Sequence, residues 1–241
     1  MGVSLRLTGL SSSAAALRYW ERRQEVVSNN LANVDTTGFK GERVFARLTE
    51  GALPEADTAT DATGGALKET GSPLDLALAG DGYLVVDTPD GERLTRGGSF
   101  HLDAEGRVLD GSGNPLLGET GPLTVPAGSA AVEVSGAGVV RAGGREIGRL
   151  RLEGVPPGTR LQHAGAGLFI PTADARPLDE SQRTGSARLL RQGYLEESNV
   201  TALDAMVDMI SVQRAYAAVQ KAVTTLDAVR GTAANELGRP V

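Results

Sequence analysis

Cysteine is absent from this sequence, and aromatic residues make up only 4% of it. The absence of cysteine excludes disulfide bonds, thiol catalysis and metal sites built on thiolates. No segment approaches the ~18 consecutive apolar residues that a membrane-spanning helix needs, so we expect no membrane insertion. The N-terminus lacks the apolar core and cleavage site of a secretory signal peptide, so we expect export, if any, to proceed without a cleaved signal.

An excess of positive charge is also lacking, because 30 aspartates and glutamates outnumber 24 lysines and arginines and give a formal net charge of −6 at pH 7. A nucleic-acid-binding protein needs a basic face, so we expect no nucleic-acid partner. Glycine and proline are frequent, with 32 and 11 residues. Their frequency predicts many turns and much β-structure in the middle of the chain.

Residue clusters that could carry catalysis are missing as well. His101 and His163 lie in separate predicted β-segments without a second histidine at ligand spacing, so we interpret both as surface or strand-edge residues. Residues 110–114 begin like a calcium-binding loop, but Pro115 and Gly121 occupy the places of the required glycine and glutamate. This segment is better interpreted as a turn. The sequence predicts no catalytic, metal-binding or cofactor-binding residues, and a protein that is not an enzyme.

The two ends of the chain carry the clearest periodicity. In residues 199–230, apolar or small residues recur at alternating intervals of three and four, which is the spacing of a coiled-coil seam. A second stripe runs beside this seam, so the predicted helix needs neighbours on two sides. Residues 10–34 show the same alternation, within a helix that we expect over residues 4–34. We interpret the two segments as a helix pair that carries the middle of the chain as an insertion. The alternative is two ordinary amphipathic helices that cap one core.

The N-terminal helix is expected to end in a turn near Asp35, where Gly38 can adopt positive φ. The asparagines before this turn either cap the helix or form interhelical amide hydrogen bonds that fix its register. Phe39 is either a local staple onto the helix end or an anchor in a neighbouring subunit, and we favour the anchor.

These patterns define a set of candidate assembly-interface residues at the two ends. They are Leu17, Trp20, Val27, Asn30, Leu31, Asn33, Gly38, Phe39, Asn199, Val200, Leu203, Met206, Met209, Ile210, Gln213, Tyr216, Val219 and Val223.

Two terminal motifs resemble those of the flagellar rod and hook axial proteins. One is residues 28–40, SNNLANVDTTGFK, and the other is residues 192–200, QGYLEESNV, with QRAY at 213–216. The middle of the chain is similar to the same family at SPLDLAL, GDGYL and TRGGSF, which begin at positions 72, 80 and 95. The resemblance covers nearly the whole chain and implies that the paired terminal helices line the inner tube of a helical assembly.

The resulting fold class is α+β, with paired N- and C-terminal coiled-coil helices and an inserted all-β middle domain that resembles a barrel or sandwich. We expect an N-terminal helix and turn motif at 1–40, an extended linker at 41–71, a β-rich middle domain at 72–192, and a C-terminal helix and tail at 193–241. Residues 1–40 and 193–230 together would form the helical core.

The resemblance implies a structural subunit of the bacterial flagellar basal-body rod, exported by the flagellar type III apparatus to the periplasm. Its partners would be other copies of itself and neighbouring rod and hook axial proteins. Modest length, a short linker and the segment TGPLTVPAG at 120–128 favour a proximal rod subunit over a distal one. A secreted β-domain hydrolase or a soluble coiled-coil adaptor remain alternatives from other classes.

Overall fold

The computed structural model describes residues 8–47, 55–129, 131–156, 158–178 and 189–237. The chain divides into two compact units. The helical unit contains Met1–Ala32, Glu42–Ala59 and Thr201–Val241, and the β unit contains Asn33–Gly41 and Thr60–Val200. Two terminal helices and a β-rich middle confirm the α+β class. Residues 1–7, where the first helix was expected to begin, and residues 48–54 of the expected linker lie outside the described residues.

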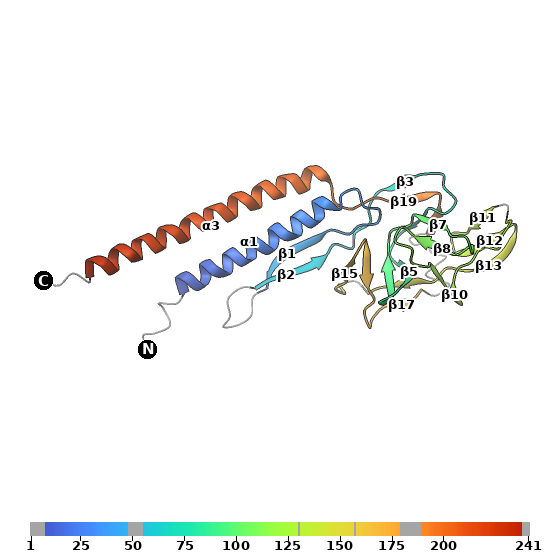
Figure 1. Cartoon of the computed structure of the whole chain (residues 1–241), viewed down its shortest axis with the longest axis horizontal. Coiled ribbons are helices and arrows are strands. Elements are labelled where there is room, and N and C mark those ends of the chain that lie inside the picture. Colours follow the sequence, from blue (N-terminus) through green and yellow to red (C-terminus); the bar gives the residue numbers. More distant parts are fainter. Residues whose placement is uncertain (1–7, 48–54, 130, 157, 179–188, 238–241) are drawn as a thin grey trace. The chain divides into compact units, whose positions relative to one another are not determined.

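Two helices, α1 (Thr8–Ala32) and α3 (Ala202–Leu237), pack against each other in the helical unit (Figure 1). Thr201 caps the N-terminus of α3, because its hydroxyl accepts a bond from the Asp204 amide and donates one to the Asp204 carboxylate. Val27 of α1 and Ala205 and Val212 of α3, all on the expected seams, are buried. Among the described residues, no helix is both long and apolar enough to cross a membrane.

The described residues of the segment expected to be a linker form three strands, of which the third, β3 (Leu67–Glu69), belongs to the β unit. β1 (Glu42–Arg47) pairs with β2 (Glu55–Thr60) and packs on α1. The Asn30 side chain of α1 binds the Glu42 backbone at two points, donating to its carbonyl at 2.8 Å and accepting from its amide at 2.9 Å. No residue of β1 or β2 is buried, so we attribute the order of these two strands to their pairing and to the packing of β1 on α1. Asn30 therefore bonds to a strand backbone instead of a facing helix.

The β unit contains one six-stranded sheet, one three-stranded sheet and four two-stranded sheets, all antiparallel within the described residues. The six-stranded sheet has the order β15 (Gln162–Gly165), β16 (Leu168–Ile170), β6 (Gly91–Thr95), β5 (Tyr83–Thr88), β14 (Leu152–Gly154) and β17 (Arg176–Pro177). The three-stranded sheet consists of β11 (Val132–Val134), β12 (Val139–Ala142) and β13 (Arg145–Arg149). Whether these sheets form a barrel or a sandwich stays a prediction.

Two of the two-stranded sheets pair neighbouring segments, and the other two pair the beginning of the β unit with its end. β7 (Phe100–Leu102) pairs with β8 (Val108–Asp110), and β9 (Leu117–Gly118) with β10 (Gly121–Pro122). β4 (Leu76–Ala79) pairs with β18 (Leu189–Gln192), and β3 (Leu67–Glu69) with β19 (Tyr194–Glu196). The last two strands thus close onto the first two strands that follow β2, which brings the C-terminal motif to the beginning of the unit.

Strand β5 is buried on both faces, which explains its continuous apolar run. Leu84 and Val86 lie in the larger apolar cluster of the β unit, while Tyr83 and Val85 lie in a second cluster. The expected turns around this strand are present. The Asp110 carboxylate closes the turn after β8 by accepting from the Ser112 and Asn114 amides, so the segment 110–114 is a turn, as expected.

Candidate functional site, a buried ionic junction of three motifs

Three charged side chains from distant parts of the sequence meet inside the β unit. Lys40 follows the turn after α1, Arg96 follows β6, and Glu196 ends β19, and their exposed fractions are only 0%, 4% and 1%. Glu196 Oε1 lies 2.5 Å from Lys40 Nζ, and Glu196 Oε2 lies 3.1 Å from Arg96 Nη1. The Gly65 amide donates a third bond to this carboxylate, at 2.8 Å. One buried anion thus binds two buried cations and one backbone amide.

Lys40 Nζ and both terminal nitrogens of Arg96 also donate to backbone carbonyls. Lys40 Nζ donates to the Thr63 carbonyl at 2.6 Å. Arg96 donates to the carbonyls of Leu78 and Gly80 at either side of the β4 end. Burial lowers the pKa of the Lys40 ammonium, and the nearby Arg96 charge adds to this effect, while contact with Glu196 opposes it. The Glu196 carboxylate therefore offsets part of the free-energy cost of burying both cations.

A backbone ribbon runs beside this ion cluster. The Gly38 amide donates to the Glu196 carbonyl at 2.7 Å, and the Asn199 amide donates to the Phe39 carbonyl at 3.3 Å. The Asn199 side chain continues the ribbon, since its Oδ1 accepts from the Gly41 amide and its Nδ2 donates to the Asp61 carbonyl, both at 2.8 Å. The predicted site residue Asn199 therefore ties three segments of the β unit together.

These contacts lie where the chain passes between the two units. The passages occur at residues 32/33, 41/42, 59/60 and 200/201. Asn199, Gly41 and Asp61 lie next to three of these passages. Asn199 bonds to both other residues, and the Asp61 amide also donates to the Gly41 carbonyl at 2.7 Å, so three ends of the β-unit segments are held together. The junction thus fixes the points on the β unit from which the chain leaves for the helical unit.

Gly38 is required for this junction in two ways. Its φ is +66°, as the sequence analysis predicts for the end of the turn. A Cβ at this position would also lie 2.2 Å from the Arg96 carbonyl carbon, which is far inside van der Waals contact. The second reason could not be read from the sequence, because it depends on the approach of a segment more than fifty residues away.

Phe39 packs within its own chain, contrary to the favoured expectation of an anchor in a neighbouring subunit. Its side chain is 3% exposed and its ring lies 5.6 Å from the His163 ring, which in turn lies 4.6 Å from Phe169. Phe39 is thus a staple, although it holds the turn to the β unit and not to the helix end. His163 lies on the edge strand β15 and His101 is exposed on β7, in agreement with the interpretation of both histidines.

Most of the remaining predicted interface residues divide between a partly buried seam and an exposed stripe. The described structure gives intermediate exposure to Leu17, Trp20, Leu31, Met209, Tyr216, Val219 and Val223. Leu203, Met206, Ile210 and Gln213 are exposed. Asn33 accepts a bond from the Thr36 hydroxyl and so belongs to the turn, while Val200 is half-buried at the end of the β unit.

Sequence reasoning assigned no role to Lys40, Arg96 or Glu196, although each stands in a quoted motif. A useful signal was available, because Lys40 is one of only three lysines in the chain and ends the N-terminal motif. Nothing in the local sequence indicates that its charge is buried. The partners lie 56 and 156 residues further on, so only the tertiary structure identifies them.

Comparison with known proteins places all three motifs in one family. The profile "Flagella basal body rod protein" matches residues 11–40, and "Flagellar hook protein FlgE/F/G D1 domain" matches residues 77–142. The profile "Flagellar basal body rod FlgEFG protein C-terminal" matches residues 191–237. Lys40, Arg96 and Glu196 fall one in each matched region, so the junction connects all three.

Individual relatives agree with these profiles. The chain is 30% identical to flagellar basal-body rod protein FlgF of Mesorhizobium japonicum, over 81% of this chain and 83% of the relative. It is 31% identical to FlgF of Caulobacter vibrioides, over 90% and 93% of the two chains. It is also 33% identical to the rod protein FlgG of Buchnera aphidicola subsp. Schizaphis graminum, over 84% and 89%.

Two terminal helices that pack against each other, and a β unit whose junction is built from backbone hydrogen bonds and an ion cluster, are features of a structural subunit. The chain belongs to the flagellar basal-body rod protein family. It is accordingly a structural protein of the flagellar basal body and not an enzyme.

Proposed function

We propose that this protein is a subunit of the proximal part of the flagellar rod and that it polymerises through α1 and α3. The observation that carries this proposal is an apolar stripe on the exposed side of α3. Leu203, Met206 and Ile210 are 73%, 53% and 51% exposed, whereas Val212 on the seam is completely buried. Several large apolar side chains together on one helix face mark a contact surface.

The seam and the stripe have different roles in this proposal. The seam pairs α3 with α1 as a coiled coil inside one subunit, and the stripe contacts the helices of adjoining subunits. Burial of each large stripe side chain would contribute about 1.5–3 kcal/mol to assembly. The seam is rich in alanine and small residues, so the α1–α3 pair alone is only marginally stable and gains its full stability in the assembly.

Alignment lengths support a proximal subunit over a distal one. The alignment with FlgF of Caulobacter vibrioides runs over 233 positions and covers 90% of the 241 residues, so about 16 positions face a gap in this chain. The alignments with FlgG run over 254 positions at 92% coverage for Bacillus subtilis and 231 positions at 84% coverage for Buchnera aphidicola subsp. Schizaphis graminum, so about 30 positions face a gap in each. FlgF is thus matched with fewer insertions.

The partners in this proposal are other copies of the chain and the neighbouring axial proteins of the rod and hook. The flagellar type III apparatus would export the chain, without a cleaved signal, to the periplasmic part of the basal body. The absence of cysteine agrees with export in an unfolded state, because no disulfide can obstruct passage.

Imaging of basal bodies purified from a deletion strain tests the proposal. Loss of a proximal subunit should leave basal bodies without a rod beyond the base, and the reintroduced gene should restore the rod and motility. A rod that lacks only its outer end would instead assign the chain to the distal part. Intact rods and normal motility in the deletion strain would contradict both assignments.

A further inference from the structure

The ion cluster lies at the boundary between two parts of the β unit that are held together in different ways. One part, which we call the polar layer, consists of residues 38–41, 61–69 and 194–200. None of these residues belongs to either apolar cluster of the β unit. Backbone hydrogen bonds and the Lys40–Glu196 ion pair join its three segments. Regions with few buried apolar contacts open at a lower free-energy cost than an apolar core does.

Two glycines lie where the polar layer meets the rest of the β unit. Gly71 follows β3 and has a φ of +73°, and Gly193 precedes β19 and has a φ of +78°. The amides of Thr70 and Gly71 both donate to the Gly193 carbonyl, at 2.8 and 3.1 Å. Beyond these glycines, Leu76 of β4 and Leu190 of β18 belong to the larger apolar cluster. The β3–β19 ribbon thus joins the apolar core through two adjacent glycines, which adopt a wider range of backbone angles than other residues.

The Arg96 side chain connects the polar layer to the core. Its guanidinium is fixed on the core side, where it donates to the carbonyls of Leu78 and Gly80. On the other side it donates to Glu196 of the polar layer at 3.1 Å. Within the described residues, both hydrogen bonds of the Lys40 ammonium stay inside the polar layer. The two cations therefore differ, because Lys40 holds the polar layer together and Arg96 binds it to the core.

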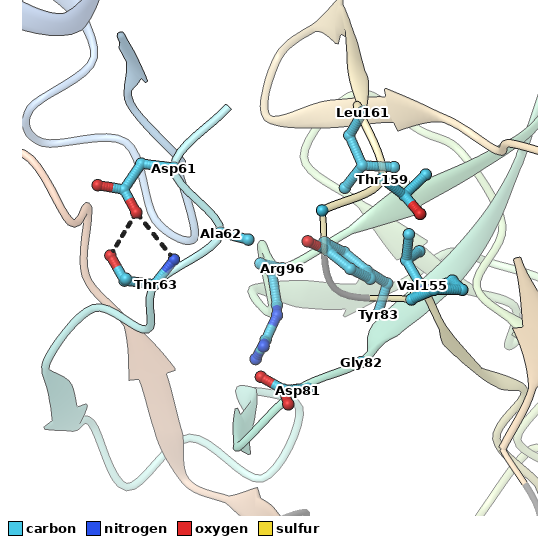
Figure 2. Close-up of a pocket in the computed structure, with 12 residues that line it drawn as sticks. Asp61, Ala62, Thr63, Asp81, Gly82, Tyr83, Arg96, Val155, Thr159 and Leu161 are labelled. Atoms are coloured by element: carbon cyan, nitrogen blue, oxygen red, sulfur yellow. Dashed lines mark hydrogen bonds between the residues drawn. The ribbon is translucent and has the colours of Figure 1, made fainter. Parts of the chain in front are cut away.

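Packing between the polar layer and the core is incomplete beside this connection. A cavity of about 380 Å³ lies between them. Figure 2 shows the segment 61–63 on one side of the cavity, Val155 and Leu161 on the other, and the Arg96 side chain between them. Phe39 adds a ring contact to the core. Side chains that face a cavity lack packing partners there, so the cost of separating the two parts is reduced.

We propose that the polar layer is a hinged element of the β unit. It turns on Gly71 and Gly193 when the bond between Arg96 and Glu196 opens, while the apolar core stays folded. Hinges of this kind concentrate the change of backbone angles in a few residues at the ends of elements.

Such a motion would move the ends of the β-unit segments together. Gly41, Asp61 and Val200 belong to the polar layer and lie at or next to three passages to the helical unit. Opening of the hinge lets the subunit shift these three points during assembly without unfolding its sheets. The proposal concerns a single subunit and holds for either part of the rod.

Distances between two spin labels on the full chain, measured by double electron–electron resonance, test the hinge. Lys68 is exposed on β3 in the polar layer, and Ser112 and Asp90 are exposed in turns of the core. Lys68→Cys with Ser112→Cys is therefore the hinge pair, and Asp90→Cys with Ser112→Cys is the control pair. The absence of native cysteine makes the labelling specific. Lys68 is three residues from Gly71, about 10 Å along the strand, so a rotation of roughly 30° would move its label by about 5 Å.

Arg96→Met and Lys40→Met distinguish a hinge from a general loss of stability, because each removes one cation from Glu196. Arg96→Met should broaden the distance distribution of the hinge pair by about 5 Å or more, with little change in the control pair. Lys40→Met should leave both distributions narrow although it destabilises the unit, because the Arg96–Glu196 bond remains. Equal broadening in the two variants, or no broadening in Arg96→Met, would overturn the proposal.

If Arg96→Met does not fold, urea below the unfolding midpoint provides the test in a chain with the native junction. The distribution of the hinge pair should broaden at urea concentrations at which that of the control pair is unchanged. A simultaneous change in both pairs would mean that the polar layer opens only together with the core, and would equally refute the hinge.

Discussion

Replacement of Lys40 by methionine removes one of the two cations that Glu196 binds while keeping a side chain of similar length. Removal of one partner of a buried ion pair costs about 3–5 kcal/mol in typical proteins. Here Glu196 would keep its contacts with Arg96 and the Gly65 amide, and the desolvation cost of the Lys40 ammonium would disappear. We therefore expect about 3 kcal/mol of destabilisation, at the lower end of this range.

Urea and thermal unfolding of the full chain, followed by circular dichroism, measure this effect. For a unit of this size, a loss of about 3 kcal/mol lowers the melting temperature by roughly 6–12 °C. Hydrogen exchange should be faster for the amides of Gly38 and Gly41, which bind the C-terminal motif. Lys68→Met is the matched control, because Lys68 is exposed on β3 of the same unit and its replacement should cost about 0.5 kcal/mol or less.

A double-mutant cycle then separates the pair from its surroundings. Glu196→Gln alone leaves two buried cations without their anion and should cost more than Lys40→Met alone. The double variant should be less destabilised than the sum of the two single variants, because the two side chains interact directly. If Lys40→Met destabilises the chain no more than Lys68→Met, or if the single effects simply add, the ion pair does not hold the junction.

Three further changes test other parts of the structure. Phe39→Ala should destabilise the isolated subunit by about 3–5 kcal/mol, because the ring is buried in its own chain. The melting temperature of the subunit measures this effect. An unchanged melting curve together with lost rods would restore the anchor interpretation. Ile210→Asp should preserve the helicity of the isolated subunit and block rod assembly. Val212→Asp should already reduce helicity in the isolated subunit, because Val212 is buried and Ile210 is not. Normal motility of the Ile210 variant would contradict the stripe assignment. Burial raises the pKa of Tyr83 above 10.0, so its contribution to stability is complete below pH 10.0 and is lost as the pH rises through the higher folded value. Absorbance of the phenolate should reveal one late tyrosine, and Tyr83→Phe should weaken the alkaline loss of stability; simultaneous titration of all tyrosines would refute this.

The sequence alone determined the elements whose signals are local. The alternation of three and four residues predicted both terminal helices, because a helix face repeats within a single segment. The apolar run at 83–86 predicted β5, and glycine in the turn before Phe39 predicted positive φ. The paired terminal motifs were sufficient to indicate the family, since their order and residue types are preserved within short stretches of chain.

Only the tertiary structure decided what the motif residues do. Strands β1 and β2 bury none of their residues, so their order depends on α1 and on Asn30. Phe39 could be assigned to its own β unit only when His163 was found beside it. Lys40, Arg96 and Glu196 form one ion cluster through contacts that span 100 residues or more. The sequence does not distinguish a buried charge from an exposed one, because burial and partners are set by segments that only the fold brings together.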